Sequence, residues 1–425
     1  MHSAWISLFV FIVCYILFTV FPSRRAWTAC VGSALLIFTG VLKWNDALFR
    51  VVNWNVMGLF VGTLVLAELF MLSKVPAALA EWFVDKSRSA CGAMLALCAL
   101  SGIISIFVEN VAVVLLMAPV ALSLAKRLGI SPVPLLLGIS VSSNLQGTAT
   151  MTGDPPSMIL AGSMRMGYLD FFIYHGRPSI FFAVQIGALC SLLVLAVLFR
   201  KHRTLVTVVL QEKIRSWMPS TLLALLIIGL SFSTIIDPTF SWFAGMFTLI
   251  LALLGGVWFK LIARWGTVKK ILQEIDWDTT LFLIGVFILV GGLTNSGWLQ
   301  RIANGMIYIV GTNTVLAFTI VVLVSVAISG FVDNVPFLLI MMPVTQELAQ
   351  KVAAPIPLLI FGLLIGTCLG GNLTPIGASV NVVTLGILKK HGYSIGFREF
   401  FSVGLPFTTA AILSSCLFVL WIWGA

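Results

Sequence analysis

The stretch SSNLQGTATMTGDPPSMI, Ser142–Ile159, interrupts a long apolar segment with two glycines, two adjacent prolines, several hydroxyl side chains and one aspartate. Around it, 60% of the chain's residues are hydrophobic and 9% are charged, whereas about a quarter of a soluble domain's residues are charged. This composition indicates a membrane protein. Inside a bilayer, a helix is interrupted only where its loose carbonyls and amides face protein or a water-lined cavity. The stretch therefore predicts a broken helix at membrane depth.

The residue types around the break each have a local reason. Pro155 and Pro156 lack backbone donors and suit the first turn of a new helix, with Asp154 as its N-cap. Gly147 and Gly153 let the chain turn without a Cβ atom. Such a break exposes carbonyls to a cation and a half-helix N-terminus to an anion, as in many secondary transporters. The hydroxyl groups come from Thr148, Thr150 and Thr152.

A second break of the same kind lies in GGNLTPIGASVN, Gly370–Asn381, where Pro375 is the breaker. A constant spacing of 224 residues relates the pairs Gly147 and Gly371, Thr150 and Thr374, Gly153 and Gly377, Pro119 and Pro343, and Glu109-Asn110 and Asp333-Asn334. One structural unit is therefore used twice. We predict a first membrane repeat over residues 1–199, a basic cytoplasmic linker over 200–216, and a second membrane repeat over 217–425.

Apolar runs long enough to cross a bilayer, about 20 residues each, recur from end to end. They lie at Ala4–Phe21, Trp27–Leu42, Val51–Leu72, Ser89–Ala125, Pro134–Ala161, Ser179–Phe199, Pro219–Ile236, Ser241–Phe259, Thr279–Leu293, Thr314–Leu348, Pro357–Leu388 and Val403–Trp423. The first run lacks a basic leader, so we interpret it as a retained helix.

Two of these runs, Ser89–Ala125 and Thr314–Leu348, are too long for one crossing and fit a re-entrant hairpin of two short arms. The predicted tips carry Glu109-Asn110 and Asp333-Asn334. A carboxylate at that depth costs about 3 kcal/mol or more, so intramembrane acids usually serve a function. We predict a proton or cation site at the tips; the alternative is that both acids only cap a helix by accepting backbone amides.

The fold class follows as an all-α polytopic membrane protein. Each half would contribute three crossings, a re-entrant hairpin, a broken helix and a final crossing. Five complete passages per half are an odd number, so the halves would be inverted repeats. With both termini outside, the linker side holds all of the 25 Lys and Arg residues except Lys43, Arg50, Arg165, Arg177, Arg301 and Lys351. This positive-inside bias explains the net charge of +10 better than nucleic-acid binding does.

Two stretches of the chain resemble a known family. GTCLGGNLTPIGASVNVVTLGILKKHGY, Gly366–Tyr393, and GTATMTGDPPSMI, Gly147–Ile159, are similar to the ion transporter superfamily, nearest to its branch of the melanosomal P protein and the arsenite efflux permeases. The resemblance spans nearly the whole chain. It implies a scaffold domain and a transport domain in each protomer, a homodimer, and sites between hairpin tips and broken helices. Sodium-dicarboxylate relatives carry Ser-Asn-Thr at the tips, where this chain has Glu109-Asn110-Val111 and Asp333-Asn334-Val335. That departure favours titratable carboxylates.

The predicted substrate- and ion-binding residues are Glu109, Asn110, Asn144, Gly147, Thr148, Thr150, Gly153, Asp154, Asp333, Asn334, Gly371, Asn372, Thr374, Gly377, Ser379 and Asn381. Among them, Asp333 and Glu109 are the predicted coupling carboxylates. Asp154 is either a ligand or only a helix cap, since Ala378 at the equivalent place has no carboxylate. The unwound segments offer amides and hydroxyls but no arginine.

The function predicted from these features is secondary active transport of a small inorganic ion or oxyanion, coupled to a proton or sodium. Arsenite or antimonite efflux is the first hypothesis; a sodium/proton antiporter, a sodium-coupled dicarboxylate or sulfate permease, and an ion channel are the alternatives. An enzyme is not expected, because there is no HExxH motif and no GxSxG with a placed histidine. The seven cysteines stand singly, as packing residues do. We expect no cofactor, no structural metal and no nucleic acid, contact with membrane lipid, and a bacterial or archaeal plasma membrane.

Overall fold

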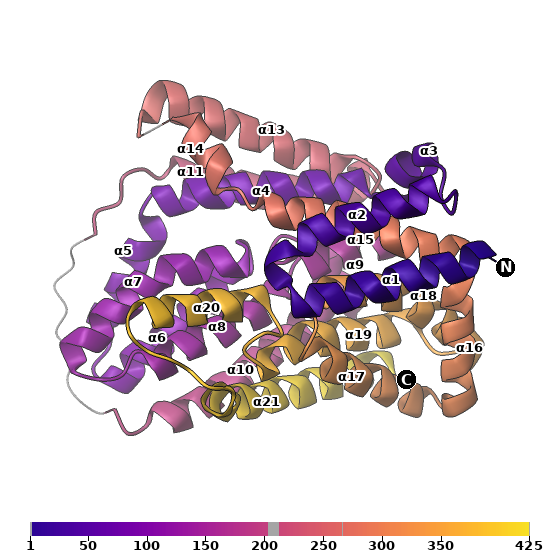
Figure 1. The fold of residues 1–425 in the computed structure, drawn as a ribbon. Helices are drawn as coiled ribbons and strands as arrows, with labels where there is room; N and C mark the ends of the chain where they lie inside the picture. Colours follow the sequence, from indigo (N-terminus) through magenta and orange to yellow (C-terminus); the bar gives the residue numbers. More distant parts are fainter. Residues whose placement is uncertain (1, 203–211, 266, 425) are drawn as a thin grey trace.

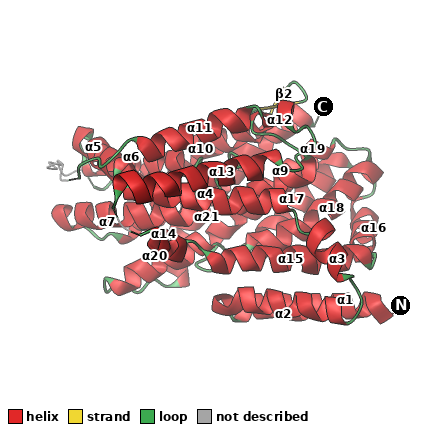
Figure 2. Cartoon of the chain, turned by 90° about the horizontal axis from the view of Figure 1, so that it is seen from above, coloured by secondary structure: helices red, strands yellow, loops and turns green. Residues whose placement is uncertain are grey.

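The computed structural model describes residues 2–202, 212–265 and 267–424. Within these residues it is a bundle of 21 α-helices, joined in places by short 3-10 or π turns, with one two-stranded hairpin, β1 (Ile173–Tyr174) and β2 (Arg177–Pro178) (Figures 1 and 2). The all-α prediction is confirmed. Most of the predicted linker, residues 203–211, lies outside the described residues.

The first half contains ten helices. They are α1 (His2–Val20), α2 (Arg25–Phe38), α3 (Trp44–Asp46), α4 (Trp54–Leu72), α5 (Val75–Lys86), α6 (Ala90–Ser105), α7 (Asn110–Leu128), α8 (Val133–Gly147), α9 (Pro155–Met164) and α10 (Ile180–Phe199). The second half continues with α11 (Met218–Ser231), α12 (Ser233–Ile236), α13 (Phe243–Trp258), α14 (Val268–Glu274), α15 (Trp277–Asn295), α16 (Trp298–Val310), α17 (Thr314–Ser329), α18 (Asn334–Val352), α19 (Ile356–Gly370), α20 (Ser379–Lys390) and α21 (Phe397–Trp423).

Eight helices of the described chain are long and apolar enough to cross a membrane. They are α1, α4, α7, α10, α13, α15, α19 and α21, three of them extended or trimmed by a few residues at their ends. Three further helices, α6, α11 and α17, are apolar but shorter. The protein is therefore a multi-pass integral membrane protein, as its composition predicts.

The breaks fall where the sequence places them. Chain segments 106–109 and 330–333 separate α6 from α7 and α17 from α18, and segments 148–154 and 371–378 separate α8 from α9 and α19 from α20. Side-chain contacts recur with the same spacing: Thr150 Oγ1 donates to the Ile106 carbonyl, and Thr374 Oγ1 to the Gly330 carbonyl. The order of helices and these two side-chain contacts are therefore the same in α4–α9 and in α15–α20.

The two hairpins approach the middle of the bundle from opposite ends. Figure 1 places α6 and α7 at the left end of the bundle, beside α5, and α17 and α18 toward the right end, where the two ends of the chain are marked. Each hairpin contacts the broken helix of the other repeat, because α7 packs against α20 and α18 packs against α9. The four polar segments therefore meet near the centre. The orientation of the bundle relative to a membrane stays a prediction.

The predicted order of three crossings before each hairpin leaves out two helices that the structure contains, α5 and α16. Each precedes a hairpin, and they have only 12 and 13 residues. Helix α16 is amphipathic, with Leu299, Ala303 and Val310 buried. The apolar residues of an amphipathic helix lie on one face and are separated in sequence by polar ones. A search for continuous apolar runs of bilayer length therefore does not detect it.

A loop outside the spanning helices gives a stability prediction. Asp237, which precedes α13, is buried and accepts hydrogen bonds from Trp242 N (2.8 Å) and Phe243 N (3.0 Å). Burial raises the pKa of the Asp237 carboxyl, but hydrogen bonds to its charged form outweigh this and lower the pKa from the ordinary 3.8 to about 2. The ionised carboxylate therefore stabilises the fold, by on the order of 2 kcal/mol.

We expect Asp237→Asn to lower the Tm of the purified protein. Since the folded-state pKa is depressed, the difference from wild type is full above pH 3.8 and is lost as the pH falls toward about 2. Thermal unfolding of both proteins across this range measures it. A difference that stays constant over the whole range would contradict the role of the ionised carboxylate.

Candidate functional site

A cavity of about 40 Å³ lies where both hairpin tips and both helix breaks meet. It is lined by Arg25, Glu109, Asn110, Val111, Asn144, Asp154, Pro155, Asp276, Thr279, Phe282, Asp333, Asn334, Val335, Ala378 and Ser379. A water needs about 10–15 Å³ of such volume, so the space suits a small ion or a few waters. Both repeats contribute to its wall.

The first-repeat wall is built around Asn110. Its Nδ2 donates to Asn144 Oδ1 (3.0 Å) and to Asp154 Oδ1 (3.1 Å). The neighbouring Glu109 caps α7, since its Oε2 accepts from Ala112 N (3.0 Å). Asp154 is 3% exposed, and its second oxygen, Oδ2, has no hydrogen-bond partner among the described residues. A buried, half-satisfied carboxylate thus faces the cavity.

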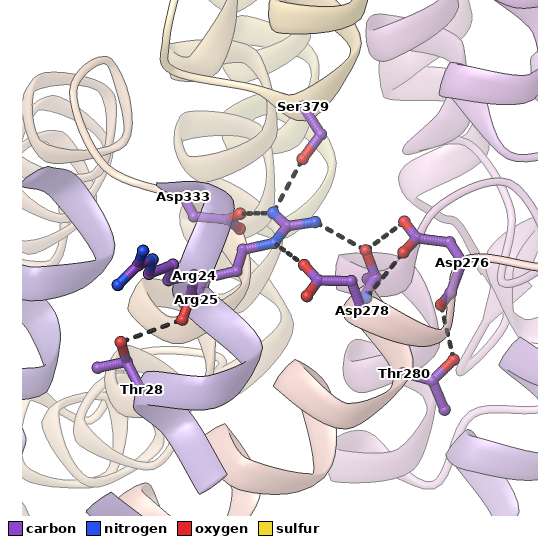
Figure 3. A network of polar contacts seen from close by, with 9 residues as sticks. Arg24, Arg25, Thr28, Asp276, Asp278, Thr280, Asp333 and Ser379 are labelled. Carbon is purple, nitrogen blue, oxygen red and sulfur yellow. Dashed lines mark hydrogen bonds and ion pairs between the residues drawn. The ribbon is translucent and has the colours of Figure 1, made fainter. Parts of the chain in front are cut away.

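The second-repeat wall is organised by Arg25, at the start of α2 (Figure 3). Its Nη1 lies 2.7 Å from Asp333 Oδ2 and donates to Ser379 Oγ at 3.1 Å. Nη2 donates to Thr279 Oγ1 at 2.7 Å, and Nε lies 3.5 Å from Asp278 Oδ2. The side chain is 16% exposed. Asp333 also caps α18 through Val335 N (3.1 Å), so this acid has partners on both oxygens.

Arg25 is the residue that sequence reasoning missed. We expected it in a cytoplasmic loop, and the unwound segments themselves contain no arginine. The structure instead buries its guanidinium against Asp333, and its Cζ lies 5.0 Å from the centroid of the Phe282 ring. A signal was present. We predicted a crossing from the apolar run that follows it, Trp27–Leu42, although this run is shorter than the roughly 20 residues that a crossing needs. If the run ends at one membrane surface, the residue before it lies below the other surface.

Asp154 occupies the N-cap position of α9, but its side chain does not cap the helix. The reason is local: Pro155 and Pro156 have no N–H to donate, and Ser157 N is bonded to the main-chain oxygen of Asp154. The carboxylate is left free to turn toward Asn110. This removes the helix-cap explanation for its presence, although it leaves the ligand role a prediction.

Seven of the predicted site residues line the cavity: Glu109, Asn110, Asn144, Asp154, Asp333, Asn334 and Ser379. The others hold the breaks together away from its wall: Gly147, Thr148, Thr150, Gly153, Gly371, Asn372, Thr374, Gly377 and Asn381. Asn381, for example, donates to the carbonyls of Gly371 (2.9 Å) and Thr374 (3.0 Å). Whether any of these binds a transported species stays a prediction.

The cavity wall carries more acidic than basic side chains. The wall contains four acids, Glu109, Asp154, Asp276 and Asp333, and a single guanidinium, that of Arg25, so it is net negative when all four acids are ionised. Among the described residues there is no group of three or more His, Cys, Asp or Glu placed to hold a metal ion. A monovalent ion with mixed carboxylate and amide ligands fits better than a tightly held divalent metal.

Comparison with known proteins adds the family. A model described as CitMHS, citrate transporter, matches residues 14–366 and 207–425 in two overlapping alignments. An uncharacterized transporter of Mycobacterium tuberculosis is 27% identical over 429 residues, covering 98% of both chains. The P protein of Mus musculus is 26% identical over 475 residues, covering 92% of this chain and 56% of its own.

Two solved structures share the fold at low sequence identity. The YdaH transporter of Alcanivorax borkumensis has a TM-score of 0.60 and 12% identity, covering 99% of this chain and 98% of its own. MtrF of Neisseria gonorrhoeae, described within a class of antimetabolite efflux pumps, has a TM-score of 0.56 and 12% identity, covering 99% and 95%. At such identity the likeness concerns architecture alone.

Proposed function

Since the chain belongs to the CitMHS citrate transporter family, which makes it a secondary transporter, we propose that it works by alternating access with a proton or sodium as coupling ion. The observation that carries the proposal is the central cavity, where four carboxylates and one guanidinium from both repeats line about 40 Å³ of space. Protons and small cations compete for such carboxylates, and this competition couples their movements.

Unequal packing of the two repeats supports alternating access. Leu115 is 49% exposed, while its repeat equivalent Leu339 is 8% exposed; Val382 is 48% exposed, while Met158 is 1% exposed. Helix α9 packs against α4, whereas the equivalent pair, α20 and α15, is in marginal contact at most among the described residues. Exchanging these two packings between the repeats would give a second state with access from the opposite end.

Sodium/proton exchange is the transport reaction that the cavity supports best. The wall carries excess negative charge, and the space is too small for an organic tricarboxylate in this conformation. An ion channel could use the same acids, but two different packings of equivalent elements favour a carrier. The relatives and structural neighbours are transporters, which are not enzymes.

A second candidate is cation-coupled movement of an oxyanion, and the observation that favours it is Arg25. A guanidinium binds carboxylates and oxyanions through paired hydrogen bonds, and the family description names citrate. Arsenite and antimonite, the first hypothesis from the sequence, are largely neutral hydroxides at pH 7. They would instead use the amides of Asn110 and Asn144 and the hydroxyl of Ser379.

Flux measurements in proteoliposomes test the proposal. Sodium, citrate, arsenite and antimonite are offered separately under imposed pH or sodium gradients, with internal pH followed by a dye. Saturable sodium uptake that moves protons outward supports exchange; citrate or arsenite uptake that needs a sodium or pH gradient supports the second candidate. Flux that neither saturates nor depends on a counter-ion would overturn the carrier mechanism.

The inverted-repeat topology gives a further prediction. Lys201 and Lys389 are expected on the cytoplasmic side and Lys351 outside, with the N-terminus and C-terminus also outside. Single cysteines at these positions, in a background lacking the native cysteines, are labelled in intact cells by a membrane-impermeant thiol reagent. Labelling at 351 but not at 201 or 389 is the expected result. Equal labelling at 201 and 351 would contradict the inverted-repeat topology.

The same proposal includes the assembly and setting of the protein. We place it in a bacterial or archaeal plasma membrane as a homodimer whose lipid-facing helices surround the transport helices. Cross-linking of the purified protein in detergent and in lipid reports the number of protomers. A monomer in both media would contradict the dimer without affecting the site.

A further inference from the structure

The two halves of the cavity are chemically unequal although the repeat relates them position by position. The 224-residue spacing pairs Glu109 with Asp333, Asp154 with Ala378, Pro155 with Ser379, and Ser105 with Ser329. Both halves therefore place an acid at the hairpin tip. They differ in what neutralises that acid.

In the second repeat, the charge is already balanced by the chain itself. The Arg25 guanidinium lies between Asp333 Oδ2 (2.7 Å) and Ser379 Oγ (3.1 Å), joining the hairpin tip to the broken helix. Nearby, the hydroxyl of Ser329 donates to the Thr367 carbonyl. No further cation is needed at this acid, because its two oxygens are bonded to Arg25 and to the amide of Val335.

In the first repeat, the equivalent space holds an additional carboxylate and no guanidinium. Asp154 Oδ2 and Ser105 Oγ are both buried without a hydrogen-bond partner among the described residues. Both lie beside Gly147: a Cβ added to this residue would lie 3.4 Å from Ser105 Oγ and 3.5 Å from Asp154 Cγ. Arg25 is the single basic residue among those that line the cavity, and it is committed to Asp333.

A buried carboxylate without a compensating charge is strongly unfavourable. The charged groups that line the cavity together with Asp154 are Glu109 and Asp333 from the two hairpin tips, and Arg25 and Asp276. Three of these four groups are acids, which add to the negative potential. Asp154 and Glu109 together call for one mobile cation in the first repeat.

We propose that Arg25 is a tethered cation that permanently fills the second-repeat counterpart of this site, so that each protomer binds one mobile coupling cation, at Asp154 and Glu109. The inference rests on the proposed cation-coupled function and specifies its stoichiometry. A transporter with two equivalent open sites would bind two. Here the sequence replaces one of them by a side chain that cannot leave.

Radioactive sodium binding to the purified protein by equilibrium dialysis counts the sites, and the sodium dependence of flux gives a Hill coefficient bounded by the number of sites. Wild type is expected to bind one sodium per protomer with a Hill coefficient near one. Asp154→Asn is expected to bind none. If protons are the coupling ion, the same count is made from proton release on substrate addition at weakly buffered pH.

Arg25→Gln opens the second site, because it frees Asp333 while keeping hydrogen-bond donors. It is expected to bind a second sodium and to raise the Hill coefficient above one. Arg25→Lys keeps a tethered charge and is expected to bind one. Arg24→Gln is the matched control: Arg24 is exposed and points away from the cluster in Figure 3, so this variant should match wild type.

Two sodium ions per wild-type protomer would overturn the inference, and so would a folded Arg25→Gln that still binds one. If Arg25→Gln elutes as aggregate on size exclusion, the count for wild type and Arg25→Lys decides the matter. The absence of any sodium or proton dependence in wild type would instead refute the proposed function, so the two failures are distinguishable.

Discussion

Replacing Asp333 by asparagine is expected to abolish ion-driven transport while leaving a folded protein. The substitution removes the partner of the buried Arg25 guanidinium, 2.7 Å away, and breaking a buried ion pair from one side costs about 3–5 kcal/mol. The freed guanidinium can turn to Asp154 or Glu109 in the same cavity, where it would occupy the place of the mobile cation. The asparagine keeps the shape of the helix cap but carries no charge.

The measurement is pH-dependent flux in proteoliposomes, with folding checked by the size-exclusion profile. Loss of measurable pH-dependent transport by a protein that elutes like wild type is the expected result. Glu109→Gln is the comparison: its carboxylate has no arginine at salt-bridge distance among the described residues, so we expect a milder defect with a shifted pH profile. If both variants transport as wild type does, the tip acids are structural and coupling must be sought at Asp154.

Replacing Gly153 by alanine is expected to prevent the helix break from forming. A Cβ at this position would lie 2.5 Å from the Gly147 carbonyl oxygen and 2.6 Å from that of Ser105. Both are backbone atoms and cannot rotate away. Overpacking of a core commonly costs about 1–3 kcal/mol, and a clash with two fixed carbonyls belongs at or above the upper end of that range.

Thermal unfolding in detergent and the yield of monodisperse protein measure the effect. Gly386→Ala in α20 is the control, because a Cβ there meets nothing within 4 Å and alanine favours the helix. The control should match wild type or exceed it in Tm. A Gly153→Ala protein with the Tm of wild type would show that the backbone at the break can move apart without loss.

The repeat and its breaks could be predicted because they depend on local chemistry. Pro155 and Pro156 stop a helix whatever surrounds them, and the spacing from Glu109 to Asp333 is a property of the sequence alone. Since unpaired backbone groups cannot face lipid, each polar interruption must lie inside the protein or beside a water-lined cavity. For this reason the sequence identifies seven of the residues on the cavity wall before any coordinates are considered.

The rest depends on tertiary packing. The depth of the α1–α2 turn decides whether Arg25 is a loop residue or a buried partner of Asp333. A pair of arginines beside an apolar run fits either position, so the sequence does not distinguish them. The side chain of Asp154 could not be assigned either, because the choice between capping α9 and bonding to Asn110 depends on a residue 44 positions away. Helices α5 and α16 lack the apolar length that marks a crossing.

The contacts between the two repeats have a consequence for how the chain is made. Asn144 in the first half donates to the Cys368 carbonyl and to Asn372 Oδ1, and α10 packs along α21. When the ribosome has released only the first 199 residues, these donors and that helix face have no partners. A nascent first half must therefore keep its polar break beside water, a translocase or a chaperone until α19 to α21 emerge, and the two halves complete their folding together.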